Sequence, residues 1–122
     1  ALLAYDGSPK AEEALFVATY AASRWQIQLS VVTVSSNGNG KLDAAKRIQA
    51  RAKTYLGLAG IEASYLLPIG PPAQMLLDAA EHEEAAFMIM GGFVLNSMRS
   101  LVLGSTLNRL LLEYKRPVLI CR

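Results

Sequence analysis

The sequence predicts an α/β protein whose mostly parallel sheet is doubly wound, with helices on both faces. Runs typical of strands alternate with runs typical of amphipathic helices along the chain, which implies crossovers between parallel strands. The strand-like runs are continuously apolar, as expected of strands buried on both faces. With 122 residues, of which 52% are apolar and 18% charged, the chain fits one globular domain spanning 1–122. Because the chain begins inside an apolar run, we expect the natural protein to start earlier or to hold this domain in a longer or tandem chain.

The first strand and the first helix are predicted from the start of the chain. Residues 1–5 form a short apolar run, and Asp6 and Gly7 follow it as a turn signal. Ser8 supplies a helix-capping hydroxyl, and Pro9 follows at the first helical position. Apolar residues then recur at the spacing of one helix face. We therefore expect a strand, a tight turn and a helix in immediate succession.

The remaining elements continue the alternation and are separated by stretches rich in glycine or proline. Runs of β-branched or continuously apolar residues predict further strands at 28–35, 61–67, 85–90 and 118–121. Apolar residues at helical spacing predict further helices at 42–59, 73–83 and 106–114. The sequence thus predicts five strands and four helices.

Two of the predicted strands end in residues suited to ligand binding. In doubly wound sheets, ligands bind outside the carboxyl ends of the strands, where the strand order reverses. The first strand ends at Asp6, whose carboxylate is suited to ribose hydroxyls or to a metal that bridges phosphates. The fourth strand ends at Gly91 and Gly92, which lead into a long loop. If these strands are neighbours, Asp6 and Gly91 face one crevice.

The start of the last predicted helix is suited to phosphate. Free N–H groups and the helix dipole favour an anion there, Gly104 permits close approach, and Ser105 and Thr106 add hydroxyl donors. The pattern is not a Walker A loop, because Gly91 and Gly104 are thirteen positions apart and no lysine follows Gly104. It is not a GxGxxG fingerprint either. The competing interpretation is that Asp6 only forms a turn and that Ser105 and Thr106 only cap the helix.

Taken together, these segments resemble the universal stress protein family over essentially the whole chain. The resemblance rests on "YDGSPKAEEAL", "IGPPAQMLLDAAEHEEAAFMIMG", "GGFVLNSMRSLVLGS" and "RPVLICR". The third segment is similar to the family's nucleotide motif, G-x2-G-x9-G-[S/T]. The resemblance implies a five-stranded parallel sheet of order 3-2-1-4-5, found as a homodimer or a tandem pair. It also implies either ATP binding or its absence, because the family contains members of both kinds.

The resemblance assigns roles to individual residues. Gly91 is the first glycine of the motif, Gly104 the third and Ser105 its hydroxyl residue. By the same alignment Asp6 contacts ribose or metal, and Val34 offers backbone groups to adenine. The second glycine of the motif falls on Val94, where a β-branched side chain resists positive φ and adds bulk beside the phosphates. The adjacent Gly92 is expected to supply part of the lost freedom. The ligand expected on this basis is ATP or AMP, with or without magnesium.

Composition excludes several other classes of function. The net charge of +2 is too small to indicate a nucleic-acid partner, and no apolar run is long enough to span a membrane. The single cysteine, Cys121, cannot form an internal disulfide, which fits a reducing, cytoplasmic location. No catalytic grouping and no metal cluster is visible in the sequence. We therefore expect no enzyme, or at most slow, incidental ATP hydrolysis.

The leading hypothesis is an adenine-nucleotide-binding regulatory module for stress responses. The alternative is a dimerisation or scaffold module of the same fold that binds no nucleotide because Val94 has closed the pocket. A nucleotide-cofactor enzyme of related fold, such as an electron-transfer flavoprotein, is less favoured, because no redox or acid–base residues converge. We expect two copies, or two tandem domains, to join antiparallel through their last strands, since exposed sheet edges invite pairing. That strand consists of Val118, Leu119, Ile120 and Cys121.

Overall fold

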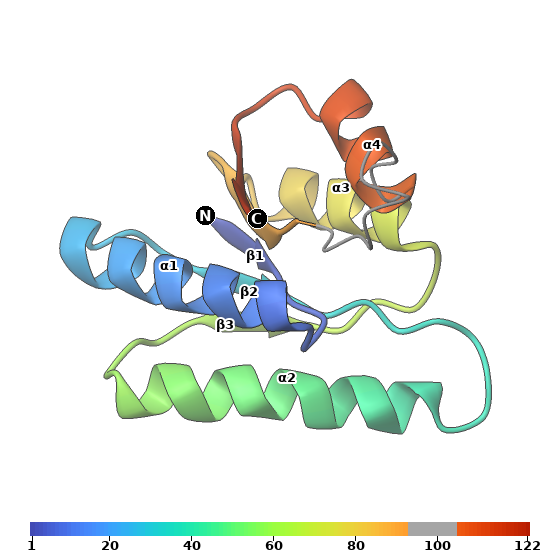
Figure 1. Cartoon of the computed structure of the whole chain (residues 1–122), viewed down its shortest axis with the longest axis horizontal. Coiled ribbons are helices and arrows are strands. Elements are labelled where there is room, and N and C mark those ends of the chain that lie inside the picture. The colour runs from blue at the N-terminus through green and yellow to red at the C-terminus, as the bar shows by residue number, and fades with distance from the viewer. Residues whose placement is uncertain (93–104) are drawn as a thin grey trace.

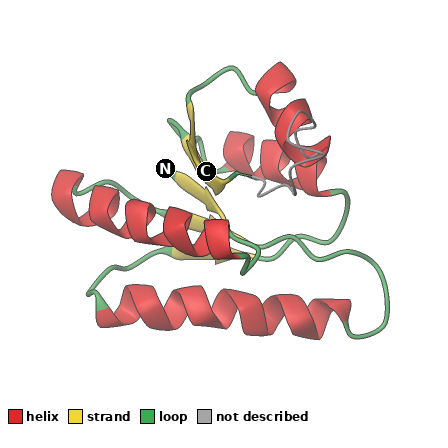
Figure 2. Cartoon of the chain, viewed as in Figure 1, coloured by secondary structure: helices red, strands yellow, loops and turns green. Residues whose placement is uncertain are grey.

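The computed structural model describes residues 1–92 and 105–122, which form a parallel sheet covered by helices on both faces (Figures 1 and 2). The strands lie in the order β3-β2-β1-β4-β5, and every pair is parallel. The elements follow one another as β1 (Leu2–Ala4), α1 (Pro9–Trp25), β2 (Ser30–Val32), α2 (Lys41–Leu58), β3 (Ser64–Leu66), α3 (Pro72–His82), β4 (Met88–Gly91), α4 (Ser105–Glu113) and β5 (Val118–Cys121). The predicted fold class, strand order and succession of elements are confirmed.

Two apolar cores lie on opposite faces of the sheet. Alternate strand residues point to opposite faces, so Leu3 and Ile89 pack under α1 and α2, whereas Leu2 and Met88 pack under α3 and α4. Small side chains on α1, such as Ala14, let that helix lie close to the sheet. Figure 1 shows the α1–α2 layer on one side and the α3–α4 layer on the other.

The first four strands are shorter than the sequence predicted, β5 has the predicted bounds, and the two edge strands are not fully buried. Backbone pairing continues past β2 in isolated contacts, such as the bridge between Ser35 and Ile69, so the strand-like run predicted at 28–35 is longer than the regular strand. In the edge strands, Ser64 of β3 and Leu119 of β5 are exposed. The prediction of burial on both faces therefore holds for the central strands and is wrong for the edges. No helix within 1–92 or 105–122 is long and apolar enough to cross a membrane.

Candidate functional site

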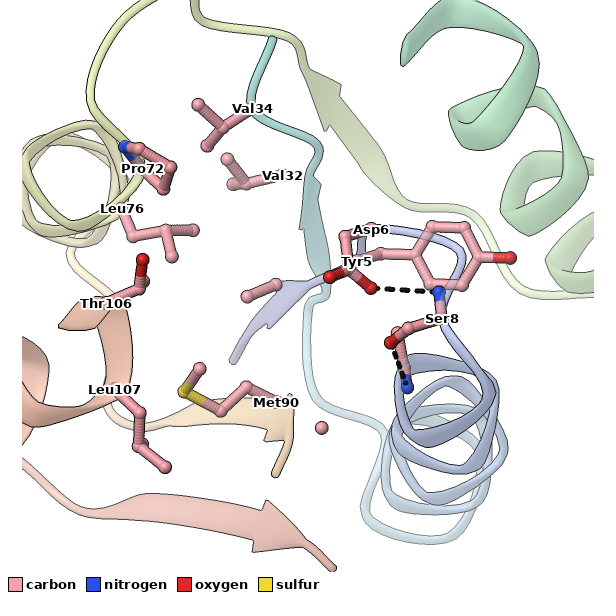
Figure 3. Close-up of a pocket in the computed structure, with 13 residues that line it drawn as sticks. Tyr5, Asp6, Ser8, Val32, Val34, Pro72, Leu76, Met90, Thr106 and Leu107 are labelled. Carbon is pink, nitrogen blue, oxygen red and sulfur yellow. Dashed lines mark hydrogen bonds between the residues drawn. The ribbon is translucent and has the colours of Figure 1, made fainter. Parts of the chain in front are cut away.

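A cavity of about 270 Å³ lies at the carboxyl ends of β1, β2 and β4, between the first turns of α1, α3 and α4 (Figure 3). This volume is just below the roughly 300–1,000 Å³ typical of small-molecule sites. Its wall is mainly apolar, and polar groups are gathered near the β1–α1 turn and the start of α4. The residues that line it are Ala4, Tyr5, Asp6, Ser8, Ala11, Val32, Val34, Pro72, Leu76, Met90, Gly91, Thr106 and Leu107.

The cavity lies at the switch point of the sheet. The chain order reverses between β1 and β4, which are hydrogen-bonded neighbours with Ala4 opposite Met90. The crossovers leave these two strands in opposite directions across the sheet, and a crevice opens at their carboxyl ends. The structure therefore confirms that the strands ending at Asp6 and Gly91 are neighbours, and it brings both residues to one cavity.

Asp6 combines a structural contact with an exposed acceptor. Its Oδ1 accepts a hydrogen bond of 2.9 Å from the Ser8 backbone N–H, and Ser8 Oγ in turn accepts one of 3.2 Å from the Ala11 N–H (Figure 3). These bonds form the turn and the N-cap that start α1. The second carboxylate oxygen of Asp6 is directed toward the cavity in Figure 3. The turn-forming role is thus present, and among residues 1–92 and 105–122 the second oxygen has no hydrogen-bond partner.

Gly91 lines the cavity and also permits a close approach between β4 and α1. A Cβ atom at this position would lie 2.5 Å from the carbonyl carbon of Lys10 and 2.6 Å from the backbone N of Ala11. Both neighbours are backbone atoms, so no side-chain rotation could relieve the clash. The first turn of α1 therefore requires glycine here, whether or not a ligand binds.

Three helices begin at the rim of the cavity, and their first turns differ in the backbone N–H donors that they present to it. In α3 the N-cap is Pro71 and Pro72 follows, so two backbone donors are missing and no side chain caps the helix. In α1 one of the free donors is already bonded by Ser8. The α4 helix starts at Ser105, and Thr106 and Leu107 line the cavity. The α4 start borders the cavity without the proline residues of the α3 start, and a helix N-terminus favours an anionic group.

The other predicted site residues have different positions. Val34 lines the cavity beyond the end of β2. Gly92 is not among the lining residues: its N–H donates a bond of 2.6 Å to the Cys121 carbonyl, so it extends the pairing of β4 with β5. Gly104, like Val94, lies outside the described residues, and of Ser105 only its place as the first residue of α4 is described.

Part of the lining was not predicted from the sequence. Leu76, Met90 and Leu107 follow the periodicity of buried helix and strand residues, and nothing in that pattern separates a core position from a cavity wall. Leu76 and Leu107 line the cavity because the beginnings of α3 and α4 border it, and Met90 lines it from the carboxyl end of β4. Ser8 was identified only as a helix cap, which it is, although it also borders the cavity.

The described wall of the cavity carries little charge. Within the described part of the chain, Asp6 is the only lining residue with a charged side chain. No group of three or more histidine, cysteine, aspartate or glutamate side chains suited to a metal occurs among the described residues. One carboxylate is enough for magnesium only when phosphate oxygens and waters complete its coordination. The arrangement is therefore suited to a ligand with an apolar ring system, hydroxyl groups for Asp6 and an anionic end.

The fold and the cavity define a doubly wound α/β protein with a small-ligand crevice at the switch point of its sheet. A model of the universal stress protein family matches residues 1–122. The chain is 33% identical over 134 residues to the "Universal stress protein in QAH/OAS sulfhydrylase 3′region" of Thermus aquaticus, with 99% of this chain and 96% of that protein covered. The chain therefore belongs to the universal stress protein family, and the resemblance seen in its motifs is confirmed.

Solved structures of family members have the same fold. A universal stress protein from Archaeoglobus fulgidus in complex with dAMP matches with a TM-score of 0.81 and 21% identity, covering 99% of this chain and 95% of that one. A universal stress protein in complex with cAMP matches with a TM-score of 0.82 and 20% identity, covering 99% of this chain and 94% of that one. At these identities the likeness concerns the fold.

Proposed function

We propose that this protein is a regulatory module that binds an adenine nucleotide, ATP or AMP. The observation that carries the proposal is the cavity at the switch point, where the second carboxylate oxygen of Asp6 faces the start of α4 across an apolar wall. Support also comes from the family relatives solved in complex with cAMP and with dAMP.

Each part of a nucleotide has a counterpart among the residues of the site. The apolar wall, which includes Val34, Leu76 and Met90, suits a flat base. The second Asp6 oxygen suits a ribose hydroxyl, because an ionised carboxylate accepts stronger hydrogen bonds than a neutral oxygen does. The α4 start, with Thr106 at the cavity, suits phosphate. Gly104 and Ser105 join this set by the family motif alone. The alternative for Asp6 is that its carboxylate holds a magnesium ion bound with the phosphates instead of contacting the ribose.

The proposed role is binding rather than catalysis. Phosphoryl transfer needs positive charge placed on the transferring oxygens and a group that orients the nucleophile. The described cavity wall contributes neutral donors and one carboxylate, which serve recognition. We expect ATP hydrolysis to be slow and incidental, and we expect the protein to act by changing its conformation or its partner affinity when nucleotide is bound. A cytoplasmic location remains a prediction.

Isothermal titration calorimetry with AMP and ATP, each with and without magnesium, tests the proposal. Asp6→Asn should weaken binding by roughly tenfold to a hundredfold, because hydrogen bonds to charged groups contribute about 1.5–3 kcal/mol. Asp43→Asn, an exposed carboxylate in the first turn of α2, is the matched control and should bind like the wild type. No heat and no thermal shift at millimolar AMP or ATP would refute nucleotide binding.

The second candidate function is a dimerisation or scaffold module that binds no nucleotide. The observation in its favour is the apolar edge strand β5, whose Leu119 is exposed. The two functions are separated by combining the calorimetry with sedimentation. A protein that dimerises and gives no heat with either nucleotide would favour the scaffold.

A further inference from the structure

A polar cluster beside the cavity joins Tyr5, after the end of β1, to α1 and α2, the two helices on one face of the sheet. The Tyr5 hydroxyl donates a hydrogen bond of 2.5 Å to Oε1 of Glu12, on α1. Nη2 of Arg51, on α2, pairs with the same oxygen. The Arg51 guanidinium also donates to the carbonyl oxygen of Gly7 at 3.4 Å. One carboxylate and one guanidinium thus connect three elements.

These contacts hold the chain on both sides of Asp6. Tyr5 precedes it and is tied through its ring hydroxyl, whereas Gly7 follows it and is tied through its carbonyl. Tyr5 and Asp6 both line the cavity, but the Tyr5 ring extends away from it (Figure 3). The turn that directs the Asp6 carboxylate is therefore fixed from the α2 side of the molecule.

The α2 helix also packs directly on this turn. Gly7 has a φ of +78°, and a Cβ there would lie 3.1 Å from Cγ2 of Ile48 and 3.3 Å from Nη1 of Arg51. A side chain at this position would be strained by the backbone and crowded by α2. The absence of a side chain at Gly7 lets Arg51 approach the turn.

We propose that Arg51, acting through Glu12, is a positioning residue that holds the Asp6 carboxylate in its orientation toward the cavity. The side chain of Arg51 is 56% exposed, and exposed ion pairs contribute little to global stability. Its loss is therefore expected to change the position of the turn more than the stability of the fold. The ligand part of this inference rests on the proposed function.

The test compares Arg51→Met with Lys46→Met, an exposed residue of the same helix. In ligand-free protein, amide hydrogen exchange measured by NMR should become faster at Ser8 in Arg51→Met, because that N–H is held by Asp6 Oδ1. The amides at the centre of β1 should be unchanged, and Lys46→Met should match the wild type throughout.

The ligand readout is a double-mutant cycle with Asp6→Asn, measured by AMP calorimetry. Arg51→Met should weaken AMP binding by about threefold to tenfold in the wild-type background and not at all in the Asp6→Asn background, because coupled residues are non-additive. An equal loss in both backgrounds would show that Arg51 acts by another route and would overturn the inference.

The experiments can refute nucleotide binding and the positioning role of Arg51 independently of each other. If the wild type gives no heat with AMP, the proposed function fails, and the exchange at Ser8 alone then decides whether Arg51 holds the turn. If the wild type binds AMP and Arg51→Met is indistinguishable from it in both affinity and Ser8 exchange, the positioning role is refuted while nucleotide binding stands.

Discussion

At the scale of single residues, Tyr5 has the most strongly perturbed titration among the described groups. Its side chain is only 2% exposed, and burial, followed by the hydrogen bond to Glu12, raises the pKa of its hydroxyl to about 12 from 10.0. The folded state therefore favours the neutral phenol more than the unfolded chain does. Its contribution to stability is complete below pH 10 and is lost as the pH rises toward 12.

This titration predicts alkaline instability that depends on one hydroxyl. The free energy of unfolding of the wild type, from urea denaturation, should fall between pH 10 and about 12. Tyr5→Phe removes the titrating group and should show a shallower fall over the same range. Burial also raises the pKa of Tyr65 and Tyr114, so part of the fall should remain in the variant. Identical slopes for the two proteins would mean that Tyr5 does not titrate in the folded state at a raised pKa.

Asp6 illustrates what a residue-level pattern could predict. An aspartate at the end of an apolar strand, before glycine and serine, indicated both a turn and a ligand contact, and the structure shows the turn bond to Ser8 with the second oxygen facing the cavity. The pattern could not indicate Glu12 and Arg51, because they come together only when α1 and α2 pack side by side.

At the scale of elements, the approach of α1 to β4 depends on Gly91. Gly91→Ala would place a methyl group against the Lys10–Ala11 backbone, so the helix or the strand must move. Overpacking of this kind costs about 1–3 kcal/mol. Thermal denaturation of the ligand-free protein should therefore show a clear loss of stability in this variant.

Gly57→Ala is the matched control for that measurement. Gly57 is the next-to-last residue of α2, and a Cβ added there would meet no neighbouring atom within 4 Å, so alanine should stabilise the helix, by at most about 0.5–1 kcal/mol. The two substitutions are chemically identical and should have opposite signs. A neutral Gly91→Ala would show that the α1–β4 contact adapts easily, and the requirement for glycine would then come from the ligand alone.

The elements themselves were largely predictable, and their ends were not. Ser8 with Pro9 marked the start of α1, because capping and proline act locally. Strand length depends on pairing with neighbours, and so the run rich in β-branched residues at 28–35 contains only the regular strand Ser30–Val32. In the same way, Gly91 was recognised as a glycine that a ligand site could need, whereas its contact with α1 is a tertiary feature without a local signal.

At the scale of the whole molecule, the alternation of strands and helices was enough to predict the fold class. It was not enough to predict the strand order. Right-handed crossovers allow several orders of five parallel strands. The order β3-β2-β1-β4-β5 was implied by the family motifs and is confirmed by the pairing. It matters for function because it makes β1 and β4 neighbours at the cavity and leaves β5 at an edge.

The edge formed by β5 leads to a prediction about assembly. Its four residues include no charged side chain, although edge strands usually carry charges or proline that prevent pairing. Leu119, near its centre, is 46% exposed. Two copies joined antiparallel through β5 would satisfy the free backbone groups of both edges and cover this side chain.

Sedimentation velocity at tens of micromolar protein tests this assembly with a matched pair of variants. The wild type should sediment as a dimer, and Leu119→Lys as a monomer, because a lysine at the centre of the paired edge would be forced against its symmetry mate. Leu58→Lys, at a leucine of α2 that is 86% exposed, adds the same charge away from β5 and should remain dimeric. Since Leu119 is already half exposed, its replacement should leave the fold intact, which circular dichroism can verify. A monomeric wild type, or a Leu119→Lys variant that stays dimeric, would exclude this edge as the interface.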